Sequence, residues 1–422
     1  MTNTENKSLF PGSSFLKVIF NYFKSRLIST LIKLSFVIVF APFLIVATIF
    51  IRIFGKKKID VGLGPDPMIN NLYHKKALIK YGYTAETFVR SVYFITSEFD
   101  YRADLNWLGK FKYIRFLNGI LLFLRAASRY RCVYIYFSGG PLTEYYFLNK
   151  LEPFLFKLSQ TRVVVMPYGG DVHDMFFAKN LLFKHAMSTD YPFYYQINDK
   201  VKSQIKRWTV KSDFVISGCD WVDHTYHWDR LMLAHFSIDL DKFEKSRNAN
   251  TDLNRQYTPE APLKVLHAPN HKTIKGSGFI LEAVEELKNE GYPIEITFLQ
   301  KRSNEEILAQ IAQADLIADQ LVIGWYAMFA LEGLASKKPV ICYLREDLIK
   351  LYLFAGLLTS RDELPFLNVG FDEIKDLLKK VLIGSIDLNK VAEKGLKYVT
   401  KHHSIEAVGK VFDEVNQKIF SK

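Results

Sequence analysis

Cysteine is scarce in this chain of 422 residues, and its three cysteines are far apart. Cys132, Cys219 and Cys342 form no CxxC pair, so neither a disulfide framework nor a zinc cluster is expected. Internal low-complexity tracts are absent as well, and apolar residues make up 49% of the chain. A chain of this length and composition can bury two cores and is not expected to be disordered. A reducing compartment fits the cysteine content.

Acidic residues are nearly absent from the first 58 positions, where Glu5 stands against nine lysines and arginines. This segment carries +8 of the net charge of +12, which leaves +4 for the remaining 364 residues. The globular part therefore has no basic excess that would indicate a nucleic-acid partner. Basic residues that flank an apolar segment are typical of contact with membrane phosphates.

The apolar segment is an uncharged run of 18 residues, 34–51, which is long enough to cross a bilayer. The preceding stretch, 14–33, predicts a basic amphipathic helix in the headgroup region. Basic residues on both sides of the run leave its orientation open. Pro42 lies at its middle, so a re-entrant hairpin with both ends cytoplasmic and a kinked single span are both open. A buried core helix is the third interpretation.

After residue 58, short apolar runs alternate with stretches of helical period. The first series predicts strands at 59–63, 87–94, 132–137, 162–166 and 214–217, with helices at 70–81 and 116–129. The second predicts strands at 263–268, 295–299, 315–318 and 339–344, with helices at 278–289, 304–314, 327–336 and 371–381. Ser303 and Glu306 predict a capping box. This alternation predicts an α/β fold with two Rossmann-like, doubly wound domains that face each other across a cleft.

These patterns divide the chain into five parts. Residues 1–58 are the membrane-associated helical segment, 59–244 the first domain and 263–400 the second. Residues 245–262 are polar and without periodicity, so we expect a linker there. Residues 401–422 form a closing helix.

The stretch 265–287 suits an anion. A strand ends, a polar loop follows, and Lys275-Gly276 precede an amphipathic helix. Free N–H groups at a helix start, together with Lys272 and Lys275, can hold a diphosphate. A solvated loop with two surface lysines is the alternative.

The stretch 319–344 suits a ribose. An irregular Gly324-Trp325-Tyr326 turn opens a helix that carries Glu332 among apolar residues. A buried carboxylate requires a partner, and two adjacent ribose hydroxyls can both donate to it. An internal salt bridge is the alternative.

Together these stretches resemble the nucleotide-sugar half of GT-B glycosyltransferases of the large retaining family 4 (group 1). The matching pieces in this chain are Lys275-Gly276, Gly324-Trp325-Tyr326-Ala327, Glu332-Gly333 and Lys338-Pro339-Val340. Upstream, residues 64–89, 166–174 and 218–243 resemble the acceptor half, and 402–415 resembles the helix that crosses back to the first domain. The resemblance covers nearly everything after the anchor.

Three positions depart from the family pattern. Gly324 stands where the first acid of the family's Glu-x7-Glu pair is found. The contact that this acid makes to the transferred sugar is therefore either absent here or made by Trp325, Tyr326 or their backbone. Asn270 replaces a common arginine, with Lys272 as its substitute. Tyr168 replaces a common histidine, although His173 is close by.

The resemblance implies a metal-independent, retaining glycosyltransferase without a cofactor. Its expected donor-binding residues are Asn270, Lys272, Lys275, Gly276, Gly324, Trp325, Tyr326 and Glu332. The expected catalytic residues, which would face the acceptor hydroxyl or the sugar, are Tyr168, Asp171 and His173. Close backbone approach is expected at Gly64, Gly139 and Gly140, where turn geometry is an equal explanation.

The expected partners are a nucleotide-diphosphate sugar, membrane lipids and a polyprenyl-diphosphate-linked glycan acceptor in surface-polysaccharide assembly. We expect the catalytic domains to face the cytoplasm. Two other functions remain open: a sugar-nucleotide epimerase of GT-B fold, and a catalytically inactive membrane scaffold. The anchor argues against the epimerase, because its substrate is soluble. An inactive scaffold would show no thermal shift with any nucleotide sugar.

Overall fold

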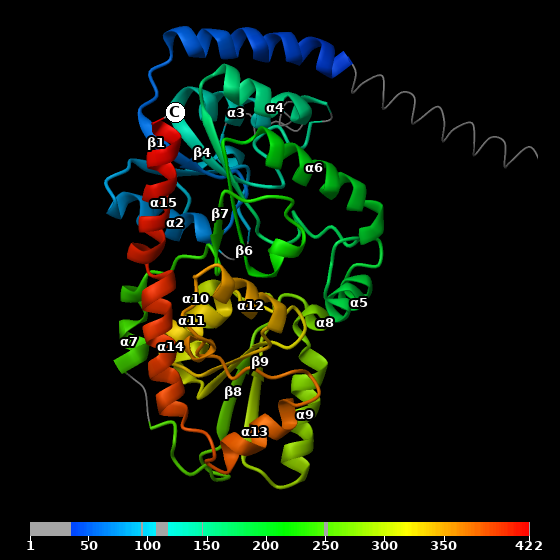
Figure 1. Cartoon of the computed structure of the whole chain (residues 1–422), viewed down its shortest axis with the longest axis vertical. Helices are drawn as coiled ribbons and strands as arrows, with labels where there is room; N and C mark the ends of the chain where they lie inside the picture. The colour runs from blue at the N-terminus through cyan, green and yellow to red at the C-terminus, as the bar shows by residue number, and fades with distance from the viewer. Residues whose placement is uncertain (1–34, 94–95, 107–116, 146, 249–251, 422) are drawn as a thin grey trace, which may run out of the picture.

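The computed structural model describes residues 35–93, 96–106, 117–145, 147–248 and 252–421. Within these residues, two parallel β-sheets follow each other along the long axis of the molecule (Figure 1). One sheet has seven strands in the order β3-β2-β1-β4-β5-β6-β7, and the other has four in the order β11-β10-β8-β9. Helices cover both sheets, which confirms the predicted α/β fold with two doubly wound halves.

The first domain contains the seven-stranded sheet. Its strands are β1 (Ile59–Leu63), β2 (Ala85–Val89), β3 (Tyr101–Arg102), β4 (Tyr130–Tyr136), β5 (Arg162–Met166), β6 (Phe214–Gly218) and β7 (Arg230–Met232). Its α-helices are α2 (Asn70–Lys80), α3 (Asn118–Arg129), α4 (Leu148–Leu158), α5 (Leu181–Asp190), α6 (Asn198–Lys211) and α7 (Glu244–Asn248).

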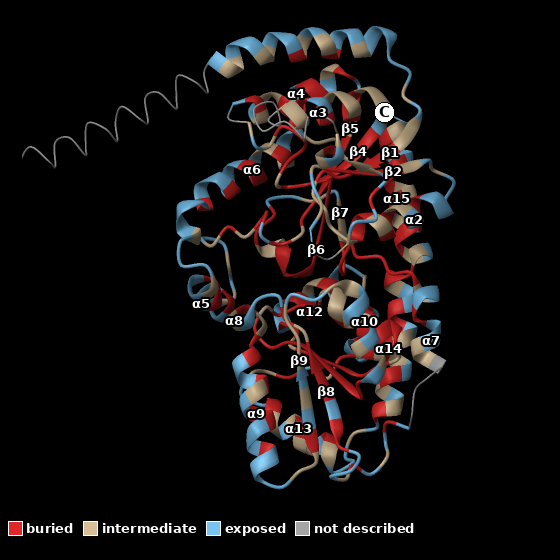
Figure 2. Cartoon of the chain, turned by 180° about the vertical axis from the view of Figure 1, so that it is seen from behind, coloured by how far each residue is buried: buried red, intermediate tan, exposed pale blue. Residues whose placement is uncertain are grey.

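The apolar strand runs arise because both faces of this sheet are buried. In β5, Val163 and Val165 enter one hydrophobic cluster, whereas Val164 and Met166 enter another on the opposite face. Figure 2 shows the strands as buried and the outer face of α6 as exposed.

The second domain contains the four-stranded sheet. Its strands are β8 (Leu263–His267), β9 (Ile294–Phe298), β10 (Leu316–Gln320) and β11 (Val340–Cys342). Its helices are α8 (Lys272–Lys275), α9 (Ser277–Asn289), α10 (Asn304–Gln313), α11 (Met328–Ala335), α12 (Glu346–Phe354) and α13 (Ile374–Leu382). The predicted capping box at the start of α10 is confirmed.

The last two helices are α14 (Leu388–His403) and α15 (Ile405–Phe420), separated by Ser404, which caps α15. Helix α15 packs beside α2, and its Val408 and Phe412 lie in the hydrophobic cluster under β1, β4 and β5 (Figure 1). The chain thus returns to the first domain after completing the second.

Several stretches differ from their predicted bounds; the strand expected at 339–344, for example, is the shorter β11. The strand expected at 87–94 lies at Ala85–Val89 instead, and the Arg90 guanidinium directly after it donates to the Gly140 carbonyl. Residues 94–95 lie outside the described residues. The expected linker 245–262 begins within α7, and its later part packs on the second domain. There Leu253 is buried and the Arg255 guanidinium binds both oxygens of Asp315 at 2.8 Å.

One helix, Ser35–Phe54, precedes β1. It is long and apolar enough to cross a membrane, with a mean hydropathy of 2.6, and 11% of it is buried. Leu44 and Thr48 are its buried residues, against the first domain. The amphipathic helix expected at 14–33 lies outside the described residues.

Candidate functional site

Each sheet has one point where the strand order reverses. In the seven-stranded sheet this point lies between β1 and β4, and in the four-stranded sheet between β8 and β10. Ligands of open α/β sheets bind beyond the carboxyl ends of the strands at such points. The loops after β1 and β4 contain Gly64, Gly139 and Gly140, and those after β8 and β10 contain 270–276 and 324–326. Most predicted site residues therefore lie at the two reversal points.

Lys275 joins the two loops of the second domain. Its Nζ lies 2.7 Å from Oδ1 of Asp319, whose side chain is fully buried at the end of β10. The backbone N–H of Leu321 donates to the Lys275 carbonyl at 3.2 Å. Gly276 has a φ of +73° and packs against Leu321 and Val322. Lys275 is thus a partly exposed cation that a buried carboxylate holds in place.

Glu332 is buried on α11, only 4% exposed. Among the described residues, the one hydrogen-bond partner of its carboxyl is Asn304, whose Nδ2 donates to Oε1 at 2.7 Å. Burial raises the pKa of Glu332 to about 7, against the opposing effects of Asn304 and of the Lys242 charge. This carboxyl can therefore change protonation near neutral pH.

The Gly324 position has no room for an acidic side chain. Its φ is +96°, and a Cβ there would lie 2.4 Å from Cδ of Arg345. Arg345 in turn pairs with Asp223 of the first domain at 2.6 Å, and both side chains are buried. The chain thus places an inter-domain ion pair over the glycine that replaces the family's first acid.

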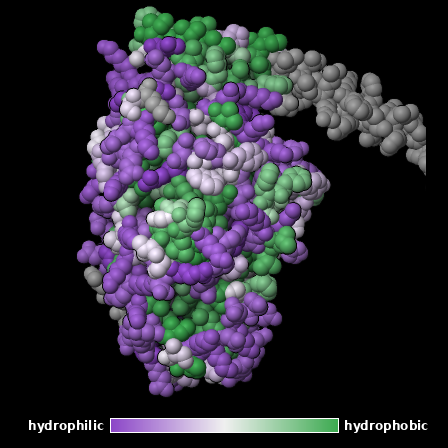
Figure 3. All heavy atoms as spheres, viewed as in Figure 1, coloured by the Kyte–Doolittle hydropathy of each residue, from purple (hydrophilic) through white to green (hydrophobic). Residues whose placement is uncertain are grey.

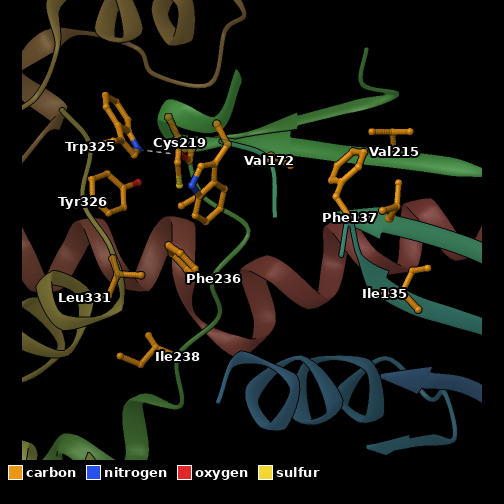
Figure 4. Close-up of a cluster of buried hydrophobic side chains, with 14 of the residues drawn as sticks. Ile135, Phe137, Val172, Val215, Cys219, Phe236, Ile238, Trp325, Tyr326 and Leu331 are labelled. Atoms are coloured by element: carbon orange, nitrogen blue, oxygen red, sulfur yellow. Dashed lines mark hydrogen bonds between the residues drawn. The ribbon is translucent and has the colours of Figure 1, made fainter. Parts of the chain in front are cut away.

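Trp325 and Tyr326 are buried and already hydrogen-bonded. The Trp325 indole N–H donates to the Leu233 carbonyl of the first domain at 2.8 Å. The Tyr326 hydroxyl lies 2.8 Å from the Tyr398 hydroxyl and 2.9 Å from His403 Nε2. Figure 4 shows both rings in a cluster with Cys219 and Phe236. Their side chains hold the domains together, so a donor contact from them is left to the backbone.

The other two predicted donor residues are at the surface of the loop after β8. Asn270 and Lys272 are both exposed. The Lys272 ammonium lies 5.5 Å from the centroid of the Phe298 ring at the end of β9. Lys272 is therefore on the same sheet edge as Lys275 but is more open to solvent.

Asp171 is the most constrained residue at the edge of the first domain. Its Oδ1 accepts the backbone N–H groups of Tyr168 and Gly169, and its Oδ2 accepts that of Phe137, each at 2.9 Å. Burial raises its pKa to about 7, although these hydrogen bonds oppose the shift. Through these three backbone hydrogen bonds, the carboxylate ties the loop after β5 to the end of β4.

His173 and Tyr168 lie in the same loop. The His173 ring packs edge-on against Phe183 and His224, with centroid distances of 4.8 and 5.4 Å. Burial lowers the His173 pKa well below its ordinary value, so the imidazole is neutral, and its buried Nε2 has no hydrogen-bond partner among the described residues. The Tyr168 ring packs edge-on against Tyr136 at 5.2 Å.

The three glycines of this edge are required by close packing. A Cβ at Gly64 would lie 1.8 Å from the Phe88 carbonyl oxygen. A Cβ at Gly140 would lie 2.5 Å from an oxygen of Glu152, and Gly139 has a φ of +110°. Packing within the protein is thus sufficient to explain these residues, without a ligand.

Three solved structures have a similar arrangement. Sucrose-phosphate synthase from Thermosynechococcus elongatus matches with a TM-score of 0.56 at 12% identity, over 86% of this chain and 100% of that chain. The Anabaena protein HepE in complex with UDP gives 0.54 at 11% identity, over 86% and 100%. An α-glucosyltransferase in complex with UDP and DNA gives 0.53 at 12% identity, over 85% and 100%.

The chain has the GT-B fold.

No family model and no curated protein sequence matches the chain. The likeness to these structures therefore establishes the GT-B fold, and the roles of individual residues rest on the geometry of this chain. Membership of the retaining family 4 stays a prediction.

In this GT-B chain, sequence reasoning missed a polar cluster in the first domain. Asp66 follows β1, and it accepts a hydrogen bond from the Ser138 hydroxyl and lies 3.6 Å from an Arg90 nitrogen. Burial raises the pKa of Asp66, and the Arg90 charge opposes the shift. The sequence feature that could have predicted this cluster is an acid and a serine that each follow a buried strand. Asp319, the partner of Lys275, directly follows the predicted strand 315–318 and could have been found in the same way.

Helix α5 of the first domain lies against the loops that carry the predicted donor residues. An Asp190 oxygen accepts the backbone N–H of Ile274 at 3.1 Å, and Asn180 donates to the Val322 carbonyl at 2.7 Å. The Tyr191 hydroxyl lies 2.7 Å from His271 Nδ1. A carboxylate of one GT-B domain thus occupies a backbone donor next to Lys275 of the other.

Proposed function

We propose that this chain is a retaining glycosyltransferase that moves a sugar from a nucleotide-diphosphate donor to a lipid-linked glycan. The supporting observations are the position of Lys275 in the segment after β8, beside the reversal point of the second sheet, and the buried Glu332 carboxyl on α11, held by Asn304. A cation and a carboxyl there match the two charged parts of such a donor, its diphosphate and its ribose. Two proteins of similar fold were solved with UDP.

The donor would lie along the edge of the second domain. Lys275 contacts the diphosphate, with Lys272 as a second, more exposed cation and Asn270 in the same loop. Gly276 allows close approach of the backbone. Glu332 accepts the two ribose hydroxyls, with Asn304 holding its carboxyl in position.

The acceptor would lie at the edge of the first domain. Tyr168 and His173 provide a phenol and a neutral imidazole, and the unpartnered His173 nitrogen can bind a hydroxyl. Asp171 positions this loop through its three backbone hydrogen bonds. Gly64, Gly139 and Gly140 keep the strand ends closely packed behind it.

The reaction requires no protein nucleophile and no metal. The bond between the sugar's anomeric carbon and the diphosphate oxygen breaks, while the acceptor oxygen bonds to that carbon on the same face. The acceptor proton passes to the departing diphosphate oxygen. Lys275 stabilises the negative charge that grows on the diphosphate, and the two domain edges align donor and acceptor.

The acceptor's location follows from the N-terminal segment. The Ser35–Phe54 helix and the basic residues around it bring the enzyme to a membrane, where a polyprenyl-diphosphate-linked glycan is anchored. The catalytic domains face the cytoplasm, where nucleotide sugars are made. Assembly of a surface polysaccharide is the process that this substrate class serves.

The test is a panel of uridine, guanosine and adenosine diphosphate sugars, incubated with the full chain and a lipid-linked glycan extract. We expect nucleotide to be released from one donor and the acceptor to become heavier by one sugar. The NMR spectrum should show a new glycosidic bond with the donor's anomeric configuration. A product of inverted configuration would contradict the retaining mechanism. Absence of transfer from every donor by folded protein would contradict the enzyme itself.

A further inference from the structure

The helix Ser35–Phe54 has one face docked on the first domain. Leu44 and Thr48 on this face are fully buried. Near one end of the helix, the Phe36 ring stacks on Tyr145 with a centroid distance of 5.7 Å. Near the other end, Ile51 lines a groove together with Leu124 of α3. The helix therefore lies flat across the end of the first domain (Figure 1).

The opposite face of this helix is apolar and open. Six of its large apolar side chains are between 61% and 66% exposed: Ile38, Val39, Val46, Phe50, Ile53 and Phe54. At 3.6 residues per turn, Val46 and Ile53 project away from Leu44 and Thr48. Figure 3 shows a continuous hydrophobic band at this end of the molecule. An exposed apolar band of this length marks an interaction surface.

A helix that stays docked in this position would not span the bilayer. Under the helix, Arg125 and Arg129 of α3 pair with Glu86 of β2, and Arg125 also lines the groove beside the helix. If the docked helix crossed the bilayer, these charged groups and the domain around them would enter hydrocarbon, at a large energetic cost.

Charged side chains border the open face. Arg52, Lys56 and Lys58 are exposed, at the end of the helix and directly after it. Cations beside an apolar helix face complement anionic lipid headgroups, and each lysine or arginine near such a surface strengthens binding. A lipid bilayer matches both the apolar band and the charges that border it.

We propose that the helix Ser35–Phe54 is an in-plane anchor, whose open face inserts into one leaflet while its other face stays docked on α3. The groove beside it, about 490 Å³ and lined by Phe43, Phe50 and Leu124, receives lipid acyl chains. The anchor differs from both the hairpin and the single span, because neither end of the helix crosses the leaflet.

The position of this anchor determines how far from the membrane an acceptor sugar must extend. The open face points away from the first domain, so that domain stands between the leaflet and the boundary with the second domain (Figure 1). The separation is on the order of 30 Å, the diameter of a small domain. Resting on the proposed function, the acceptor is therefore a lipid-linked oligosaccharide that extends from the membrane, and a bare lipid phosphate would be too short.

Depth measurements test the anchor directly. The three native cysteines are buried, so single cysteines replacing Ile38, Val46 and Ile53 can carry a polarity-sensitive dye. The full chain is bound to phosphatidylcholine–phosphatidylglycerol vesicles that contain quenchers at different acyl depths. We expect equal, shallow quenching at all three sites. Deepest quenching at Val46 indicates a spanning helix and overturns the proposal, as does an absence of quenching.

A charge variant separates the anchor from the catalytic proposal. Val46→Glu with Phe50→Glu should reduce vesicle flotation at least tenfold, whereas Phe354→Glu, at a 93% exposed site on α12, should leave it unchanged. Nucleotide binding in detergent should stay the same in both variants. Equal flotation of the double variant and the wild type overturns the anchor. A wild type that floats but binds no nucleotide overturns the proposed function alone.

Discussion

The strand ends of the two sheets face the same boundary but use their charged residues differently. On the first domain, the Asp171 carboxylate accepts three backbone N–H groups and that of Glu152 accepts two. On the second, Lys275 pairs with Asp319 and remains partly exposed, while the Glu332 carboxyl has Asn304 as its partner. Carboxylates that bind backbone N–H groups fix loops, whereas side-chain pairs can exchange partners with a ligand.

Under the proposed function, the second domain binds the donor's charges and the first domain shapes the acceptor site. The direct contacts Arg345–Asp223 and Trp325–Leu233 fix the distance between these edges. Each variant below tests one side of this division.

The largest effect is expected at Lys275. Replacing it alone would leave the Asp319 charge buried without its partner, so the informative variant is Lys275→Met with Asp319→Asn. Loss of a preorganised cation should remove about 2–4 kcal/mol of transition-state stabilisation, roughly a 30- to 1,000-fold fall in kcat/KM. Nucleotide release measures this.

The matched control is Lys288→Met, an exposed lysine on α9. If the double variant retained its rate within threefold of this control, the Lys275–Asp319 pair would be structural and the donor site would lie elsewhere.

Glu332 should show the next largest effect. Hydrogen bonds to a charged group contribute about 1.5–3 kcal/mol, so Glu332→Gln should weaken nucleotide affinity roughly 10- to 100-fold. Glu305→Gln, on the exposed side of α10, is the control. Calorimetric titration compares the two.

The pH dependence sharpens this prediction. Burial raises the pKa of Glu332 from 4.5 to about 7, so the ligand-accepting carboxylate forms as the pH rises through about 7. The affinity of the wild type for the nucleotide should therefore increase as the pH rises through about 7. The affinity of Glu332→Gln should not change over the same pH range. Because the folded state holds the proton longer than the unfolded state, this group also lowers folding stability as the pH rises from about 4.5 to 7. If the affinity of the wild type did not change with pH, a structural partner would be keeping Glu332 in one protonation state.

Asp171 should affect stability instead of donor binding. In Asp171→Asn, an amide N–H group would face backbone N–H groups, and two donors cannot form a hydrogen bond with each other. We therefore expect the free energy of unfolding to fall by about 1–3 kcal/mol. Denaturant titration measures this, with the exposed Asp199→Asn as control. Nucleotide affinity should not change. A stable Asp171→Asn variant without transfer would instead place Asp171 at the acceptor hydroxyl.

The smallest effect is expected at Asp190, whose carboxylate lies beside the proposed diphosphate position. Two like charges about 4 Å apart in water repel by about 1 kcal/mol. Asp190→Asn should therefore tighten nucleotide diphosphate binding up to about fivefold, and the distant, exposed Asp362→Asn should not. Weaker binding in Asp190→Asn would mean that α5 supports the donor loop.

Local patterns were sufficient to predict the fold. The predicted strand 162–166 matches β5 to the residue, because a strand buried on both faces is a continuous apolar run. The capping box at Ser303 is equally local. Lys275 was predicted because it follows a strand and a polar loop and precedes a helix, and Glu332 because it is the one carboxylate among the apolar residues of its helix.

Contacts between distant residues were beyond sequence reasoning. Nothing near Gly324 indicates that Arg345 covers it, or that Arg345 pairs with Asp223 in the other domain. The aromatic residues Trp325 and Tyr326 suited a sugar contact as well as a core, and only their partners Leu233 and Tyr398 favour the core. The packing of residues 252–262 depends on Asp315, about sixty positions later.

The most direct measurement is a calorimetric titration of the full chain with uridine, guanosine and adenosine diphosphates, beside the Lys275→Met, Asp319→Asn variant. We predict that one of the three diphosphates binds the wild type with a Kd at or below about 1 mM. The same diphosphate should bind the variant at least tenfold more weakly. Folded protein that binds none of them, or binds one equally in both forms, would contradict a donor site on the second domain.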